Sequence, residues 1–241
     1  MVTGPDLLIE AAVFDMDGLL IDSEPMWRQV EMDIFGRLGV PLTTEMCLET
    51  RGMVLDQVTA HWYGLYRWEG PTPDDVAAQI IEAMASLLVT RLVLKPGAVE
   101  AVAACRDRGL ALAVASSSPR RLIESVVEAM ALGPWFSVLH SAQEEGAGKP
   151  DPAVFLTTAR LLGVDPARCV VFEDSPAGVE AAHRAGMVCV AVPEGPETLI
   201  DDSAAAAFVS ADLVIGSLLE VDDDFWPRLE KRRRGAVRPV R

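Results

Sequence analysis

Short apolar runs alternate with amphipathic stretches along most of this chain. The four apolar residues Ala11–Phe14 precede a polar turn, and a run that is apolar on both faces is typical of a central strand in a helix-covered parallel sheet. Beyond Pro96 and Gly97, stretches with a period of about 3.6 residues alternate with further short apolar runs. The pattern predicts helices at 97–108, 119–130, 152–162 and 176–185, and strands at 110–115, 136–140, 169–172, 188–192 and 213–215. This alternation predicts an α/β fold with a doubly wound parallel sheet.

The segment before Pro96 differs from the rest because it contains amphipathic patterns and no apolar strand. It predicts helices at 25–39, 54–66 and 74–89, the first of them ended by Gly39. We therefore expect residues 21–91 to form an all-helical insertion and residues 1–20 and 92–241 to form the core. Aromatic residues gather in the insertion, at Trp62, Tyr63 and Trp68. They can build its own core or stack on the apolar face of a sugar.

Composition narrows the class of protein. Half of the 241 residues are apolar, and the formal net charge of −15 argues against a nucleic-acid partner. No amino-terminal targeting pattern is visible, and no apolar run approaches the ~20 residues that cross a bilayer. The four cysteines lack metal-type spacing, so we expect reduced core residues. We expect a cytoplasmic protein without a membrane partner, as a monomer or weak homo-oligomer.

The carboxyl-terminal segment is rich in basic residues, from Arg228 to Arg241. A tail that binds nucleic acid or membrane is one interpretation of this pattern. In so acidic a protein, we instead expect a solvated and partly disordered end.

The first predicted strand leads into two carboxylates. Asp15 and Asp17 start on one side of the strand, since side chains two apart point the same way, and Gly18 lets the backbone turn. Open parallel sheets bind ligands outside the carboxyl ends of their strands. Such a pair needs a compensating charge, most simply a metal cation. An Asp-rich turn with no ligand is the ordinary alternative. The residues at the other strand ends therefore decide between a ligand site and an ordinary turn.

Three further strand ends carry polar groups. Ser116 and Ser117 follow the strand at 110–115 and can offer hydroxyl and N–H groups to an anion, whereas Ser118 before Pro119 is placed as a helix N-cap. Lys149, in the loop 146–150, is one of only three lysines. The loop lacks the glycine spacing of a P-loop and otherwise suits a surface turn.

The strand at 169–172 ends in the acidic pair Glu173 and Asp174. Two carboxylates at a helix start can merely complement the helix dipole. Together with Asp15 and Asp17, however, they form a set of hard oxygen ligands of the kind that suits Mg²⁺. Ser175 and Pro176 are expected as the N-cap and first residue of the next helix.

In this order, the motifs resemble the haloacid-dehalogenase-like superfamily of phosphotransferases. The resemblance covers about Ala11 to Ser217. Its motifs are Phe-Asp-Met-Asp-Gly at 14–18, Asp-Ser-Glu-Pro at 22–25, Ser116, Gly-Lys-Pro at 148–150, Glu-Asp-Ser-Pro-Ala-Gly at 173–178 and Ala-Gly-Met at 185–187. The helical insertion after the first motif resembles the small mobile cap of that family.

The resemblance implies covalent catalysis. Asp15 is then the nucleophile that forms an aspartyl-phosphate, and Asp17 is the general acid and later the general base. Mg²⁺ is the implied cofactor, held by Asp15, Asp174 and the main-chain carbonyl of Asp17, with Glu173 in the outer shell.

The remaining implied contacts concern the substrate. Ser116, Ser117 and Lys149 bind the phosphoryl oxygens, and Lys149 also neutralises Asp15. Glu24, near the hinge of the cap, can accept a sugar hydroxyl or simply favour a helix N-terminus.

Several reactions occur within the superfamily. The second aspartate argues against a dehalogenase, and the absence of lysine from 21–91 argues against a phosphonatase. A β-phosphoglucomutase is the alternative. It resembles this chain less, because Trp27 stands where a cap histidine is expected and no arginine follows Gly52, although Arg51 precedes it. A receiver-type signalling module shares the Asp, Ser, Lys and Mg²⁺ groups but is about half this length and lacks the insertion.

The stretches 19–25, 62–63 and 68–71 resemble bacterial hexitol and 2-deoxyglucose-6-phosphate phosphatases. The sequence therefore predicts a Mg²⁺-dependent phosphatase of small phosphate monoesters, most simply sugar or hexitol phosphates.

Overall fold

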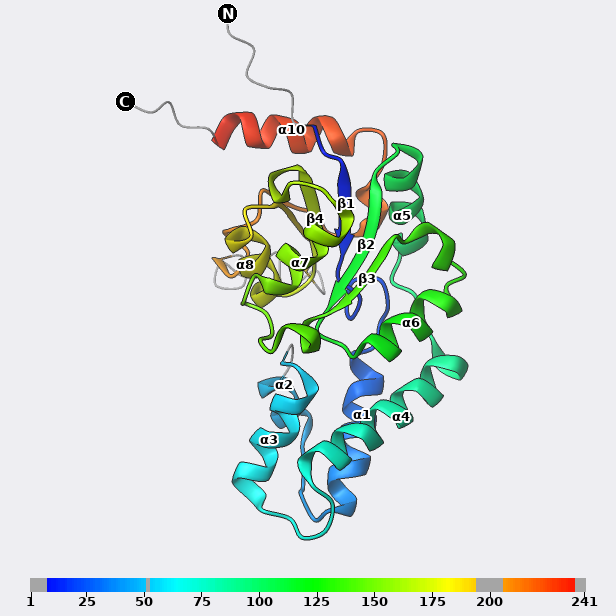
Figure 1. The fold of residues 1–241 in the computed structure, drawn as a ribbon, viewed down its shortest axis with the longest axis vertical. Helices are drawn as coiled ribbons and strands as arrows, with labels where there is room; N and C mark the ends of the chain where they lie inside the picture. The colour runs from blue at the N-terminus through cyan, green and yellow to red at the C-terminus, as the bar shows by residue number, and fades with distance from the viewer. Residues whose placement is uncertain (1–7, 51–52, 194–205, 237–241) are drawn as a thin grey trace, which may run out of the picture.

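A six-stranded parallel sheet forms the centre of the molecule in the computed structural model (Figure 1), which describes residues 8–50, 53–193 and 206–236. The strands are β1 (Ala11–Phe14), β2 (Ala111–Ser116), β3 (Val138–Ser141), β4 (Cys169–Glu173), β5 (Val188–Ala191) and β6 (Leu213–Val214). Their order across the sheet is β3-β2-β1-β4-β5-β6, and every pairing is parallel. The predicted α/β fold is confirmed. Strand order reverses between β1 and β4, the point where such sheets bind ligands.

Helices cover both faces of this sheet, as the apolar strands require. The helices of the core all follow residue 96: α5 (Ala98–Asp107), α6 (Arg120–Ala129), α7 (Ala153–Leu162), α8 (Pro176–Arg184) and α10 (Phe225–Ala236). Short 3₁₀ turns lie at Gly133–Trp135, Ala142–Glu145, Pro166–Arg168 and Leu218–Glu220. Successive residues of β1 face opposite sides, so Ala11 and Val13 belong to one buried cluster and Ala12 and Phe14 to the other. Helices α7 and α8 lie over the first face.

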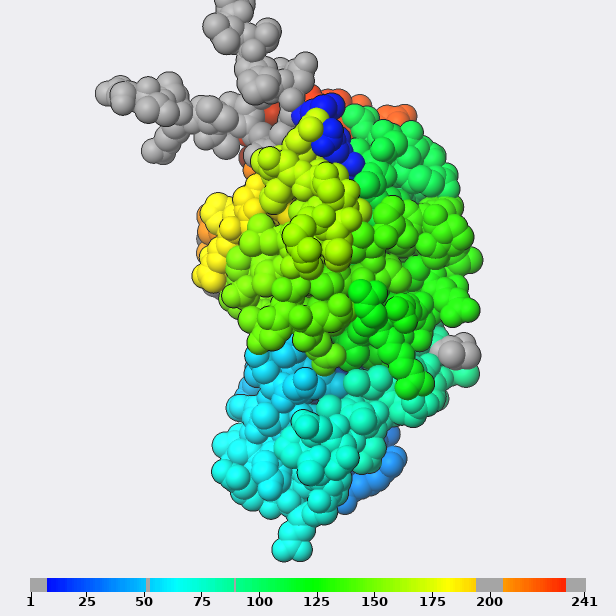
Figure 2. Space-filling model, in the orientation of Figure 1, coloured from blue at the N-terminus to red at the C-terminus, as the bar shows by residue number. Residues whose placement is uncertain are grey.

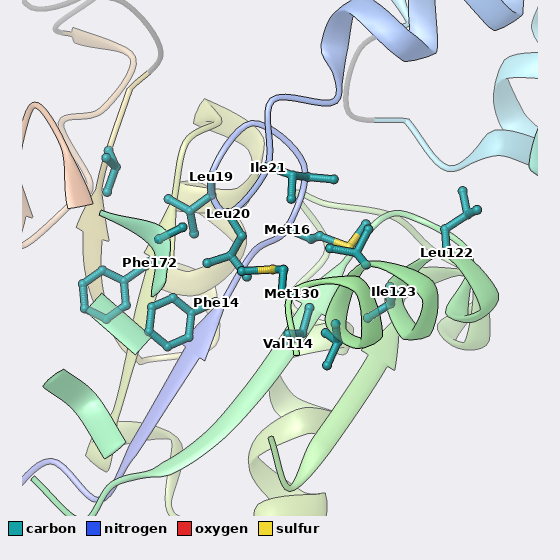
Figure 3. Close-up of a cluster of buried hydrophobic side chains, with 14 of the residues drawn as sticks. Phe14, Met16, Leu19, Leu20, Ile21, Val114, Leu122, Ile123, Met130 and Phe172 are labelled. Carbon is teal, nitrogen blue, oxygen red and sulfur yellow. The ribbon is translucent and has the colours of Figure 1, made fainter. Parts of the chain in front are cut away.

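The second face is the larger core, and Figure 3 shows its centre. Phe14 stacks on Phe172 at 4.8 Å between ring centroids, across the two strands that flank the switch in strand order. Met16, Leu19 and Leu20, in the turn that follows β1, point into the same cluster (Figure 3). Packing of these buried apolar side chains therefore fixes the position of the turn that carries Asp17.

Four helices between β1 and β2 make a separate helical lobe, seen beneath the core in Figures 1 and 2. They are α1 (Glu24–Arg37), α2 (Thr44–Glu49), α3 (Leu55–Tyr66) and α4 (Pro73–Arg91). The short α2 was not predicted, because its six residues are too few to show a clear period. Two chain segments connect the lobe to the core side by side, with an antiparallel bridge between Ile21 and Leu94 and a hydrogen bond from Asp22 N–H to the Val93 carbonyl.

The expectation of a solvated, partly disordered carboxyl-terminal end is wrong for residues 225–236, which form α10. Phe225 is fully buried and stacks on Phe172 at 5.8 Å, and Trp226 lies under the guanidinium of Arg108. The helix lies at the end of the sheet opposite the helical lobe (Figure 1). Its apolar side completes the core, and basic residues such as Lys231 and Arg232 are exposed. Residues 237–241 lie outside the described part.

Two expectations from composition can be compared with the fold. All four cysteines are buried and unpaired, which confirms the interpretation as reduced core residues. Among the described helices, none combines the length and apolarity that crossing a membrane requires.

Candidate active site

The polar ends of four strands and the inner side of the helical lobe surround one cavity of about 560 Å³. This falls within the range of roughly 300–1,000 Å³ common for small-molecule sites. The core contributes the residues that follow the strands, and the lobe contributes residues of α1, α2 and α3. Of the site residues expected from the sequence, the lining includes Asp15, Asp17, Glu24, Ser116, Ser117, Lys149 and Asp174. Residues far apart in the sequence thus meet at the switch between β1 and β4.

Lys149 lies between two buried carboxylates. Its ammonium contacts Asp15 and lies 2.5 Å from Glu173, and it also donates to the carbonyl of Ala115 at 3.1 Å. Burial works to lower the pKa of Lys149, but the charges of Asp15 and Glu173 outweigh it and raise that pKa above its ordinary value. The lysine is therefore a fixed positive charge at the base of the cavity.

Asp15 lies in the wall of the cavity, beside the Lys149 ammonium. It follows β1 directly, is 6% exposed, and lines the cavity. Burial raises the pKa of Asp15 to about 7, an effect that Lys149 opposes and the neighbouring carboxylates reinforce. Lys149 is shared by two carboxylates, Asp15 and Glu173, so this part of the site carries an excess of negative charge that a cation would offset.

Glu173 uses both of its carboxylate oxygens within the protein. One oxygen accepts from Lys149, and the other accepts from the main-chain N–H and the hydroxyl of Ser175, each at 3.0 Å. Its side chain is fully buried and is not part of the cavity wall. We interpret Glu173 as the residue that positions Lys149. Ser175 is the N-cap of α8, as predicted, since its hydroxyl accepts from Gly178 N–H.

Four hydrogen-bond donors hold the carboxylate of Asp17. Ser23 donates at 2.6 Å and the Trp27 indole N–H at 3.0 Å to one oxygen, while Ser118 at 2.7 Å and Ser116 at 3.3 Å reach the other. Asp17 is thereby fixed at the cavity wall, where it can give or take a proton.

The prediction of Ser118 as a helix N-cap is wrong. Pro119 holds the N-cap position of α6 without a side-chain cap, and the Ser118 hydroxyl instead donates to Asp17, 101 residues away in the sequence. Ser118, Ser23 and Trp27 were missed as site residues, because nothing in their local sequence indicates a contact with Asp17. Ser117, which was predicted, lines the cavity and is half-buried.

The donor set around Asp15 fits a divalent cation. Asp174 is buried beside the cavity that Asp15 also lines, and both present carboxylate oxygens at the carboxyl edge of the sheet. Within the described residues, no three His, Cys, Asp or Glu side chains gather in a metal-type arrangement. Two carboxylates and a main-chain carbonyl suit Mg²⁺, which keeps several waters and also binds substrate phosphate rather than requiring a cage of protein ligands.

The helical lobe closes the cavity with polar and apolar residues. Glu24, Trp27 and Arg28 of α1 line it, together with Met53, Leu55 and Val58. Trp62 and Trp68 are buried inside the lobe, and neither they nor Tyr63 lines the cavity. Of the two interpretations of these aromatics, the structure therefore favours a role in the core of the lobe.

Gly178 leaves the space that Glu173 occupies. A Cβ at this position would lie 1.8 Å from a carboxylate oxygen of Glu173, which Lys149 and Ser175 hold in place. Gly178→Ala is expected to shift Glu173 and Lys149 and to lower kcat about a hundredfold, because small misplacements at a reacting centre are costly. The measurement is steady-state hydrolysis of a phosphate monoester, alongside the melting temperature.

Gly64→Ala is the matched control for this prediction. Gly64 lies within α3 with nothing within 4 Å of an added Cβ, so the substitution is expected to keep activity and to stabilise the protein by roughly 0.5–1 kcal/mol. Unchanged kcat in Gly178→Ala would mean that the position of Glu173 is unimportant for turnover.

Comparison with known protein families agrees with this geometry. A family model described as a haloacid dehalogenase-like hydrolase matches residues 9–186. The chain is 41% identical over 214 residues to hexitol phosphatase B of Escherichia coli (strain K12), covering 88% of this chain and 94% of that protein. It is 32% identical to validoxylamine A 7'-phosphate phosphatase of Streptomyces hygroscopicus subsp. limoneus, covering 92% and 99%.

A solved structure shows the same arrangement of elements. CbbY from Rhodobacter sphaeroides in complex with phosphate is 27% identical, with a TM-score of 0.77, and the match covers 88% of this chain and 96% of that one.

Proposed function

We propose, since this chain belongs to the haloacid dehalogenase-like hydrolase family, that its phosphatase activity is Mg²⁺-dependent and directed at sugar or hexitol phosphates. The observation that carries the proposal is the convergence of Asp15, Asp17 and Lys149 on one cavity, with Asp174 on the same wall. A relative named hexitol phosphatase B, 41% identical, supports the substrate class. We also propose that residues 21–91 act as a cap domain over the core formed by 1–20 and 92–241, and that the protein, with its four unpaired thiols, is cytoplasmic.

The proposed first step is attack by a carboxylate oxygen of Asp15 on phosphorus. A bond forms between that oxygen and phosphorus, the ester bond breaks, and Asp17 gives its proton to the leaving alkoxide. Lys149, with Ser116 and Ser117, binds the phosphoryl oxygens as charge develops on them. Bound at Asp15, Asp174 and the carbonyl of Asp17, Mg²⁺ would supply the positive charge that this acidic chain lacks.

The second step returns the enzyme to its starting state. Asp17, now ionised, takes a proton from a water molecule that attacks the phosphorus of the aspartyl-phosphate. The bond between phosphorus and Asp15 breaks and inorganic phosphate leaves. The four donors around Asp17 keep its carboxylate in place through both steps. Closing of the helical lobe over the core would exclude bulk water from the cavity.

A panel of phosphate monoesters tests this function directly. The expected result is release of phosphate from hexitol and sugar phosphates with Mg²⁺, and a loss of at least about a hundredfold in kcat when EDTA removes the metal. Equal rates with and without EDTA would contradict the metal requirement.

The same panel tests the mutase alternative. Trp27 donates its indole N–H to Asp17 at the place where a mutase histidine is expected, which favours hydrolysis. Arg51 and Gly52, whose pattern also bore on this choice, lie outside the described residues. Faster interconversion of glucose 1-phosphate and glucose 6-phosphate than hydrolysis of either would favour the mutase.

A further inference from the structure

One face of α1 forms part of the cavity wall and reaches Asp17. Glu24, Trp27, Arg28 and Glu31 all line the cavity, and their spacing of three, four and seven residues places them on one side of the helix. Trp27 contacts Asp17, the proposed acid for the leaving oxygen. Glu31 lies one turn further, about 6 Å along the helix axis. It is therefore placed beside the part of the substrate that leaves with that oxygen.

Glu31 is unusual because it is a carboxyl group buried inside the helical lobe. The residue is 8% exposed, and its carboxyl accepts a hydrogen bond from the thiol of Cys47 on α2, another residue of the cavity wall. Burial raises the pKa of Glu31 to about 7, and the charge of Glu24 adds to this effect. Burying a carboxyl costs free energy, and an apolar residue would suit helix packing better. The presence of a buried carboxyl here despite this cost points to a role for Glu31 in substrate binding.

The chemistry of this wall indicates the kind of group it binds. A thiol is a weak donor, and a carboxyl group can make more hydrogen bonds than one thiol supplies. Because the same face carries the carboxyls of Glu24 and Glu31 beside one guanidinium, Arg28, it is poorly suited to a second phosphate. Hydroxyl groups, which both donate and accept, match a buried carboxyl that titrates near neutrality.

We propose that Glu31 binds hydroxyl groups of the substrate's carbon chain and thereby selects polyhydroxylated phosphate esters. This inference rests on the proposed function, because it takes the phosphoryl group to lie at Asp15. Glu31 acts in substrate binding and not in proton transfer, so its removal affects one class of ester and leaves the chemistry of phosphoryl transfer in place.

The test compares two esters of equal carbon number, a hexitol 6-phosphate and hexyl phosphate. In Glu31→Leu, the ratio of kcat/KM for the hexitol ester to that for the hexyl ester is expected to fall at least about tenfold, with the loss mainly in KM. Glu31→Gln should fall between Leu and the parent, since an amide still bonds to hydroxyls. The control Asp33→Asn removes an exposed carboxylate from the same helix and should leave the ratio unchanged. An unchanged ratio in Glu31→Leu overturns the proposal.

Binding without turnover separates this proposal from the proposed function. In an Asp15→Asn background, calorimetry should show weaker binding of the hexitol 6-phosphate, by at least about tenfold, when Glu31→Leu is added. Equal affinities, or no binding in either protein, overturn the role of Glu31. Binding that depends on Glu31 in a protein whose parent hydrolyses neither ester supports the role of Glu31 and refutes the hydrolytic function.

Discussion

Asp15→Asn is expected to lower kcat for phosphate monoesters at least about a thousandfold, because an amide cannot act as the nucleophile. The same change should leave the folded protein at least as stable as the parent. Asp15 and Glu173 share the ammonium of Lys149 inside the protein, so removing one carboxylate leaves a neutral buried pair. Loss of activity without loss of stability distinguishes a catalytic role from a structural one. The measurements are turnover and thermal unfolding.

The difference in melting temperature between the parent and Asp15→Asn should depend on pH, because the pKa of Asp15 is raised. Below about pH 4, Asp15 is protonated in both the folded and the unfolded state and resembles asparagine, so the two melting temperatures should be similar without metal. Between about pH 4 and pH 7, the unfolded chain ionises Asp15 while the folded parent keeps it protonated, so the parent loses stability relative to Asp15→Asn as the pH rises. The gap should therefore widen from about pH 4 to about pH 7 and level off above that. A gap that narrows over this range would contradict the assigned direction of the pKa shift.

Lys149→Met is expected to have the largest combined effect. Without the ammonium, the carboxylates of Asp15 and Glu173 face each other in the interior, and breaking a buried ion pair in this way costs about 3–5 kcal/mol of unfolding free energy. The phosphoryl oxygens also lose their fixed positive charge, which should lower kcat/KM at least about a hundredfold. Denaturant unfolding in metal-free buffer and ester hydrolysis measure the two effects.

A second substitution separates charge balance from catalysis. Adding Glu173→Gln to Lys149→Met removes one of the two opposed carboxylates, so most of the stability should return. Activity should stay low, since the double variant still lacks the ammonium. If activity returned with stability, the function of Lys149 would be only to neutralise Glu173.

The fold was largely predictable because its signals are local. Ala11–Phe14 is apolar on both faces, which suits a central strand buried from both sides. The carboxyl-terminal helix was not predicted, because its many arginines suggested a solvated end. The signal for a packed helix lay in three apolar residues that contact the core: Phe225, Trp226 and Leu229.

The candidate site was predictable where its groups directly follow strands. Asp15, Ser116 and Asp174 stand at strand ends, and parallel strands bring such ends to one edge. The partners supplied by tertiary packing were not predictable. Ser118 belongs to a helix start by its local sequence, yet it bonds to Asp17. Glu31 is one polar residue within an amphipathic helix, and only the cavity on its side gives it significance.

The most direct test of the central claim is to trap the phosphoryl group on the protein. The enzyme is quenched with acid during turnover of a hexitol 6-phosphate, reduced with borohydride and digested for mass spectrometry. Reduction of an acyl phosphate at Asp15 gives homoserine in the peptide that contains residues 11–18, which is the result expected here. An unmodified Asp15, or homoserine at Asp17 or Asp174 instead, would contradict the assignment of Asp15 as the nucleophile.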